Sequence, residues 1–160
     1  MDPLYLSWKM KMLNYSVRFV ELADTLNSSM PDYVVARFQD LLNRYGRCIR
    51  GTRILVSGVS YKRDVSDIRE TPAERVLELL VQRGGDVSWC DPMVDPKIRT
   101  LGGATAVGFD EGLERAEACL IVTDHRQVDY ARLCIREIPI LDTRGVTRKL
   151  GIEREWVELI

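Results

Sequence analysis

The chain has 160 residues, of which 46% are hydrophobic and 29% charged, and its formal net charge is −1. This length is enough for one compact domain with an appendage, and the composition is ordinary for a globular protein. The balanced charge argues against a nucleic-acid or membrane surface. No apolar run approaches the roughly 20 residues that span a bilayer, and no signal peptide is expected. We therefore predict a cytoplasmic protein.

Residues 3–47 are predicted to be helical, because apolar residues over 34–45 recur at the spacing of one helix face. The stretch 27–31 fits either a new helix start or a kink in one long helix. The earlier part is rich in large apolar residues, which are Leu4, Trp8, Met12, Leu13, Phe19, Val20, Leu22 and Leu26. Such a surface needs a partner, either the following domain or another subunit.

From Gly51 the pattern changes to apolar runs that alternate with helical segments. We predict strands at 52–60, 86–90, near 106–107, at 118–123 and, as the last strand, at 138–142. The intervening helices are predicted from Thr71 to the Gly84-Gly85 pair, at about 110–116 and at 127–135. This alternation predicts an α/β fold with a Rossmann-like, doubly wound parallel sheet at 49–160, preceded by a long helical segment at 1–48.

The stretch from Gly58 to Ala73 follows the first strand and opens a helix with a capping-box sequence, Thr71-Pro72-Ala73-Glu74. The first strand and helix of a dinucleotide-binding fold are joined in this way. Ser60 and Arg63, however, stand where the second and third glycines of a dinucleotide fingerprint belong. A turn that keeps the architecture, lacks these glycines and carries cations indicates a different phosphate ligand.

Ligands of doubly wound sheets bind outside the carboxyl ends of the strands. Lys62 and Arg144 are the two cations at these ends that we consider candidates for holding a diphosphate. Tyr61 is a candidate aromatic wall for a base. The alternative is that Lys62 and Arg144 form ion pairs with nearby acidic residues, namely Asp64, Asp67 or Asp142.

Asp91 and His125 also follow strands. Asp91 occupies the position of a ribose ligand in a dinucleotide site, but without the glycines a strand stop and turn at Asp91-Pro92 is favoured. His125 is either a general base or a structural hydrogen-bonding residue. Because no Ser or Cys nucleophile motif surrounds it, the structural role is favoured.

The four cysteines, Cys48, Cys90, Cys119 and Cys134, are far apart and show no Cys-x-x-Cys spacing. This usage favours reduced core cysteines of a cytoplasmic protein over disulfides. His125 is the single histidine, so we predict no metal site.

The run from Gly58 to Ala73 resembles the start of the C-terminal, UDP-binding domain of the UDP-glucose/GDP-mannose dehydrogenases. Asp91-Pro92, 123–125 and 141–144 match later motifs of that domain. Upstream, 2–9, 18–23 and 27–31 resemble the central helical segment, so the resemblance covers essentially the whole chain. The sequence at 5–9 is most similar to that of the branch that acts on UDP-N-acetylhexosamines.

The resemblance implies an oxidoreductase that converts the C6 alcohol of a nucleotide sugar to a carboxylate with two NAD⁺, in the biosynthesis of polysaccharides. The resemblance implies that Tyr61, Lys62 and Arg144 contact the UDP-sugar and that Arg69 reaches NAD. Asp2 matches the aspartate that follows the catalytic cysteine, and we expect no ordered role for it here.

The family's catalytic cysteine and NAD domain would precede Met1, so the resemblance implies a C-terminal fragment. We expect it to bind the UDP part, to form a homodimer through 3–47, and to be inactive alone without binding NAD. The alternative is a non-catalytic binding or regulatory module that dimerises with a full-length paralogue. A standalone response-regulator-like or flavodoxin-like domain is disfavoured, because the acidic phospho-acceptor cluster and the Ser/Thr-rich phosphate loop are missing.

Overall fold

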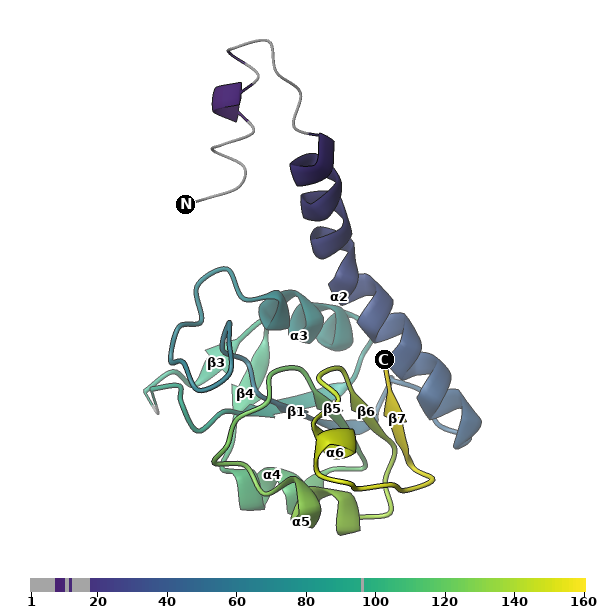
Figure 1. Cartoon of the computed structure of the whole chain (residues 1–160). Helices are drawn as coiled ribbons and strands as arrows, with labels where there is room; N and C mark the ends of the chain where they lie inside the picture. The colour runs from purple at the N-terminus through teal and green to yellow at the C-terminus, as the bar shows by residue number, and fades with distance from the viewer. Residues whose placement is uncertain (1–7, 11, 13–17, 96) are drawn as a thin grey trace.

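The computed structural model describes residues 8–10, 12, 18–95 and 97–160. From β1 (Arg53–Ser57) onward the chain forms one sheet with helices on both faces (Figure 1). The predicted α/β, Rossmann-like fold with a preceding helix is therefore confirmed. Asp2 and part of the segment 3–47 lie outside the described residues, so the expectations placed on them stay predictions.

The sheet has seven strands in the order β3-β4-β2-β1-β5-β6-β7. All neighbouring strands run parallel except β3 and β4. β2, β3 and β4 lie on one side of β1, and β5, β6 and β7 lie on the other side. The direction in which strands are added to the sheet therefore reverses between β1 and β5. The strands are β1 Arg53–Ser57, β2 Asp86–Cys90, β3 Thr100–Leu101, β4 Ala104–Ala106, β5 Ala118–Ile121, β6 Ile140–Asp142 and β7 Val157–Leu159.

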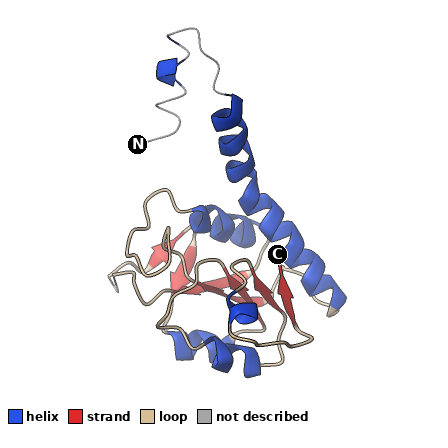
Figure 2. Ribbon diagram, viewed as in Figure 1, coloured by secondary structure: helices blue, strands red, loops and turns tan. Residues whose placement is uncertain are grey.

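Helices cover the two faces of this sheet in separate layers (Figure 2). On one face α2 packs on α3, and their apolar residues share a core with Ile54, Val56 and Leu120 of the sheet. On the other face a second core forms around Leu55, Cys119 and Leu133. The helices are α2 Arg18–Arg44, α3 Pro72–Gln82, α4 Phe109–Arg115, α5 Tyr130–Ile135 and α6 Val146–Lys149.

Helix α2 is continuous through Pro31, so the stretch 27–31 lies inside one long helix and is not a new start. Its C-terminal half is buried against the domain, with Phe38 and Leu42 fully enclosed. Its N-terminal half projects away from the sheet (Figure 1) and leaves Phe19 88% exposed. Among the described residues, no helix is both long and apolar enough to cross a membrane.

Because the C-terminal half of α2 shares a core with the sheet, the division of the chain at 48/49 separates elements that pack together, and it stays a prediction.

The expectation that 138–142 is the last strand is wrong, because α6 and β7 follow it. β7 pairs in parallel with β6 at the edge of the sheet. Glu158 of β7 forms ion pairs with Arg37 and Arg44 of α2, so the strand is held by a helix far away in sequence. A three-residue edge strand held by such contacts has little local signal.

Candidate functional site

The turn after β1 begins at Gly58, where the chain passes close to the end of β5. Gly58 has φ 80°, and a Cβ built on it would lie 1.8 Å from the carbonyl oxygen of Thr123. Its N–H donates to the carbonyl of Cys90 at the end of β2 (2.9 Å). Only glycine allows this approach, which brings the carboxyl ends of three strands together at the point where the strand order reverses.

Asp91, which follows β2, fixes the start of the turn. Its Oδ2 accepts hydrogen bonds from the N–H groups of Val59 (2.8 Å) and Ser60 (2.9 Å), and its Oδ1 accepts one from Met93 N–H (2.8 Å). The carboxylate is fully buried. The geometry thus agrees with the turn interpretation of Asp91, because its oxygens are already used inside the protein.

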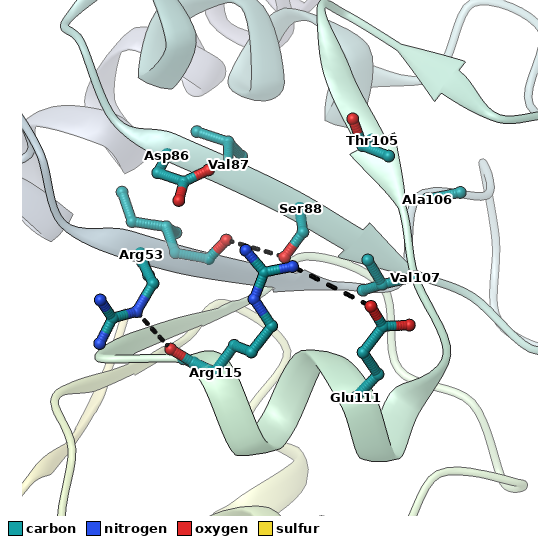
Figure 3. A pocket seen from close by; sticks show the side chains of 11 residues that line it. Arg53, Asp86, Val87, Ser88, Thr105, Ala106, Val107, Glu111 and Arg115 are labelled. Carbon is teal, nitrogen blue, oxygen red and sulfur yellow. Dashed lines mark hydrogen bonds and ion pairs between the residues drawn. The ribbon is translucent and has the colours of Figure 1, made fainter.

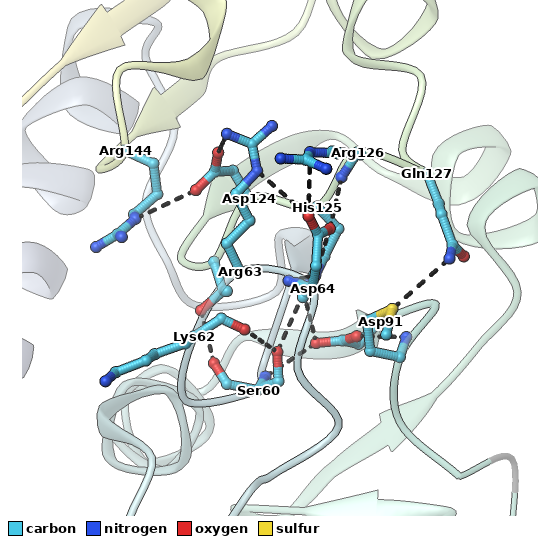
Figure 4. Close-up of polar contacts among 12 residues, drawn as sticks. Ser60, Lys62, Arg63, Asp64, Asp91, Asp124, His125, Arg126, Gln127 and Arg144 are labelled. Carbon is cyan, nitrogen blue, oxygen red and sulfur yellow. Dashed lines mark hydrogen bonds and ion pairs between the residues drawn. The ribbon is translucent and has the colours of Figure 1, made fainter.

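His125, which follows β5, completes this buried network (Figure 4). Its Nδ1 accepts a hydrogen bond from Asp64 N–H (3.0 Å), so in the neutral ring the proton lies on Nε2. Nε2 is 3.1 Å from both Asp91 Oδ2 and Ser60 Oγ. Asp64 has φ 58°, and its Oδ1 accepts from Arg126 N–H (3.0 Å). The structural role favoured for His125 agrees with this geometry.

A pocket of about 230 Å³ opens beside this turn, and it brings together Tyr61 and Arg144, two of the predicted substrate residues. The N-terminal end of α3 and the middle of α2, including Pro31 and Val34, form its apolar wall. Tyr61 is 52% exposed, and the Nζ of Lys62 lies 5.2 Å from the centre of its ring. Lys62 makes no ion pair with any residue that the structure describes.

Arg144 is positioned by the turn after β6. The buried carboxylate of Asp142 accepts from Arg144 N–H (2.9 Å), and it also accepts from the N–H (2.9 Å) and hydroxyl (2.7 Å) of Thr147. The Arg144 side chain meets a different acid, with its Nε 3.5 Å from Asp124 Oδ1. The proposed alternative pairing partners were Asp64, Asp67 and Asp142, and none of them holds the guanidinium of Arg144.

Sequence reasoning selected neither Asp124, which contacts the pocket residue Arg144, nor Arg63, which contacts Asp124. Asp124 follows β5 and its side chain is only 4% exposed, yet it lies between the guanidinium groups of Arg63 and Arg144 (Figure 4). Arg63 Nη1 is 3.4 Å from Asp124 Oδ2. The available signal was the position of Asp124 at a strand end, but its two partners come from turns 61 and 20 residues away in sequence.

Arg69, the predicted NAD contact, is turned back on its own loop. Its Nε and Nη2 donate to the two carboxylate oxygens of Asp67, at 2.9 and 2.7 Å, and its side chain is 86% exposed. The hydrogen bond from Arg69 lowers the pKa of Asp67 from 3.8 to about 2. Asp67 in turn holds the loop closed, because its carbonyl accepts from Tyr61 N–H (2.7 Å).

The turn does not fit the pyrophosphate of a dinucleotide. In a dinucleotide site the N–H groups of this turn and of the following helix bind the pyrophosphate. Here the N–H groups of Val59 and Ser60 are taken by the buried carboxylate of Asp91. The described residues also include no group of three or more His, Cys, Asp or Glu placed to hold a metal ion.

A second hollow, of about 260 Å³, lies between α4 and the sheet, and one end of it is formed by the first residues of β1 and β2 (Figure 3). Its arginines are engaged within the protein. Arg53 Nε donates to the carbonyl of Arg115 (2.8 Å), and Arg115 Nη1 is 4.0 Å from Glu111. We therefore place the candidate site at the Tyr61 pocket, at the carboxyl ends of β1, β5 and β6.

Comparison with known proteins identifies the family of the chain. Residues 55–149 match the UDP binding domain of the UDP-glucose/GDP-mannose dehydrogenase family. The chain is 28% identical over 139 residues to the UDP-N-acetyl-D-mannosamine dehydrogenase of Methanococcus maripaludis, covering 82% of this chain and 31% of that protein. It is 29% identical over 135 residues to the NDP-N-acetyl-D-galactosaminuronic acid dehydrogenase of Ralstonia nicotianae, covering 82% and 30%.

Among solved structures, a UDP-glucose dehydrogenase from Pyrobaculum islandicum superposes with a TM-score of 0.75 at 27% identity, covering 98% of this chain and 34% of that one. A UDP-D-ManNAc dehydrogenase from Pyrococcus horikoshii shares the fold with a TM-score of 0.73 at 22% identity, covering 94% and 35%. The chain thus spans about a third of the length of the relatives it matches.

Proposed function

The chain belongs to the UDP-glucose/GDP-mannose dehydrogenase family through its UDP binding domain, and from this premise we propose that the Tyr61 pocket binds the uridine diphosphate part of a nucleotide sugar. The observation that carries the proposal is the convergence of Tyr61 and Arg144 on one pocket, with the Lys62 ammonium 5.2 Å from the centre of the tyrosine ring. An aromatic ring suits a pyrimidine base, and cations suit phosphate.

The test is a calorimetric titration of the chain with UDP. We expect measurable binding that weakens about tenfold or more in Lys62→Ala and in Arg144→Ala, because each removes a charge-assisted contact worth roughly 1.5–3 kcal/mol. Lys97→Ala is the matched control, since Lys97 is an exposed lysine outside the pocket. Unchanged UDP binding in both Lys62→Ala and Arg144→Ala would refute the assignment.

We further propose that the whole-protein function is oxidation of the C6 alcohol of a UDP-sugar to a carboxylate with NAD⁺, with UDP-N-acetylhexosamines as the favoured substrates. The curated relatives named above, whose names specify N-acetylated sugars, support this choice. The 160 residues would contribute substrate binding to this reaction. They would not bind NAD by themselves, because two N–H groups of the turn after β1 already donate hydrogen bonds to Asp91.

The isolated chain is proposed to be inactive. Burial raises the pKa of the Cys90 thiol to about 12 and that of the Cys134 thiol to about 11. Burial also raises the pKa of the Cys119 thiol well above its usual value. These thiols stay protonated at neutral pH and are poor nucleophiles. Incubation of the purified chain with UDP-sugars and NAD⁺ is expected to produce no NADH, and reproducible turnover would contradict the proposal.

We also propose that the chain dimerises through the projecting half of α2. Five exposed apolar residues form one stripe at spacings of three and four, and they are Phe19, Leu22, Leu26, Met30 and Tyr33. At about 100° per residue this stripe lies roughly 120° around the helix from the buried stripe that includes Val34 and Phe38. The helix therefore has a second apolar face that the domain does not cover, which supports a second copy as its partner.

Light scattering after size exclusion tests the dimer. The double substitution Leu22→Glu and Leu26→Glu is expected to convert a dimer to a monomer, whereas Ile135→Glu, at a 71% exposed apolar residue of α5, should not. A monomeric unsubstituted chain would count against the homodimer. Capture of a co-expressed full-length dehydrogenase by that monomer would favour the alternative, a regulatory module that pairs with a paralogue through the same face.

A further inference from the structure

A buried carboxylate joins two arginines that come from different turns of the site. Asp124 follows β5, Arg63 lies in the turn after β1 and Arg144 lies in the turn after β6. We propose that Asp124 is a positioning residue that holds Arg63 and Arg144 as a pair for the second phosphate of a nucleoside diphosphate. This inference rests on the proposed UDP binding and assigns Arg63 as an additional ligand contact.

The environment of Asp124 sets it apart from the exposed ion pairs of the molecule. Its side chain is 4% exposed, and its Oδ2 makes no hydrogen bond within the described part of the chain although Arg63 Nη1 lies at 3.4 Å. Its Oδ1 is 3.5 Å from Arg144 Nε, at the outer limit of a hydrogen bond. A buried charge is costly unless it is paired, so Asp124 needs both arginines nearby.

The two arginines keep donors for a ligand while Asp124 holds them. Arg63 and Arg144 are 43% and 49% exposed at their side chains. Each guanidinium has five N–H donors, and the contacts to Asp124 involve only Nη1 of Arg63 and Nε of Arg144. The Nη groups of Arg144 make no hydrogen bond to residues that the structure describes. Arg144 lines the proposed UDP pocket, so these groups are available there.

The charge around the site matches a diphosphate. Lys62, Arg63 and Arg144 supply three positive charges, and the buried Asp124 cancels one of them. Asp64, which is 3.7 Å from Arg63 Nε, is offset by Arg126, whose Nε lies 3.4 Å from it. The remaining two positive charges match the two phosphate groups of a nucleotide sugar. Two cations fixed on a common carboxylate prefer a ligand whose oxygens span both of them, because charge-assisted bonds depend on orientation. The pair would therefore distinguish a diphosphate from a monophosphate.

Titration of UDP and of UMP into the full 160-residue chain at constant salt tests this inference through the ratio of the two affinities. Asp124→Asn keeps the size of the side chain but removes its charge, and Arg63→Gln removes one member of the pair. In both variants we expect the preference for UDP over UMP to fall about tenfold, because one oriented charge-assisted contact is lost. Asp124→Asn also raises the positive charge, so UMP binding should not weaken.

Two matched controls accompany these variants. Arg126→Gln removes another arginine of the same edge, 80% exposed and 3.4 Å from Asp64, which does not reach Asp124. Asp110→Asn breaks an exposed aspartate–arginine pair with Arg132, outside the pocket. Both are expected to leave the ratio of UDP to UMP affinity unchanged. A thermal melt of each variant reports folding separately.

The outcomes are distinct. Equal weakening of UDP and UMP binding together with a lowered melting temperature would show a merely structural role for Asp124 and overturn the inference. An unchanged ratio in Arg63→Gln would also overturn it, even where Asp124→Asn fails to fold. In either case UDP binding by the unsubstituted chain would leave the proposed function intact, whereas absence of that binding would overturn the proposed function itself.

Discussion

The acidic and basic side chains at the carboxyl ends of the strands occupy different environments. The side-chain carboxylates of Asp91 and Asp142 are buried, and backbone N–H groups use both oxygens of each. The cations Lys62 and Arg144 are exposed, and Arg144 lines the pocket. The acids thus shape the turns, and the cations are the side chains that we propose to bind the ligand. Asp124 lies between these classes, because it is buried but is in contact with side chains.

This contrast predicts that loss of a buried acid affects stability, whereas loss of a pocket side chain affects binding. The largest effect is expected for Asp91→Ala. The substitution leaves the N–H groups of Val59 and Ser60 without their acceptor, and each unsatisfied buried group costs roughly 1–3 kcal/mol. We expect the free energy of unfolding to fall by about 4 kcal/mol, measured by urea denaturation followed by circular dichroism.

The matched control is Asp95→Ala. Asp95 Oδ1 accepts from Lys97 N–H at 2.9 Å, the same local contact that Asp91 makes with Met93, but it is exposed. Its loss should change the unfolding free energy by less than about 1 kcal/mol. Similar losses of unfolding free energy in Asp91→Ala and Asp95→Ala would show that burial of an acid does not determine its contribution to stability.

An intermediate effect, on binding alone, is expected for Tyr61→Ala. Tyr61 is half exposed and lines the pocket, so little core packing is lost, but the base loses its aromatic wall. Stacking of a base on an aromatic side chain contributes roughly 1–3 kcal/mol, so UDP affinity should fall about tenfold with no change in melting temperature. Tyr61→Phe retains the ring and should bind as the unsubstituted chain does. Equal loss in both variants would exclude stacking.

The smallest effect is expected at Asp67, a partly exposed acid that tests whether full burial is needed for a structural role. Its pKa is lowered to about 2 by Arg69, so the folded state favours the ionised form. The stabilisation is present above the unfolded pKa of 3.8 and is lost as the pH falls through about 2. The small stability difference between the unsubstituted chain and Asp67→Asn should therefore shrink between pH 4 and pH 2.

Arg69→Gln is the control for the Asp67 experiment, because it removes the partner that lowers the pKa. It should reproduce the pH dependence of Asp67→Asn in denaturation curves. A stability difference that stays constant or grows as the pH falls would contradict the role of the Asp67–Arg69 pair.

Most of the fold was predictable from sequence because its elements carry local signals. β1 and β5 are buried apolar runs. α3 begins at Pro72, directly after the N-cap Thr71, whose hydroxyl accepts from Ala73 N–H, and it ends before the Gly84-Gly85 pair. β3, α6 and β7 were not predicted. They are two to four residues long, and β7 depends on ion pairs with α2 and on pairing with β6.

The site was predictable to the extent that strand ends converge in such a sheet. That rule selected Tyr61, Lys62 and Arg144, and the structure brings Tyr61 and Arg144 to one pocket. The rule does not predict which acid forms an ion pair with which cation. Asp124 lay in the same set of strand-end residues, but its burial and its position between two arginines follow from the packing of three turns.

The dependence of the turn after β1 on distant residues limits what protein engineering can do with it. The segment from Gly58 to Thr71 is continuous in sequence, yet Asp91 and His125 fix its backbone, and the end of β5 leaves no space for a side chain at Gly58. Transplanting this segment into another doubly wound sheet would therefore transfer its side chains without its shape. A working graft has to carry both anchors with it.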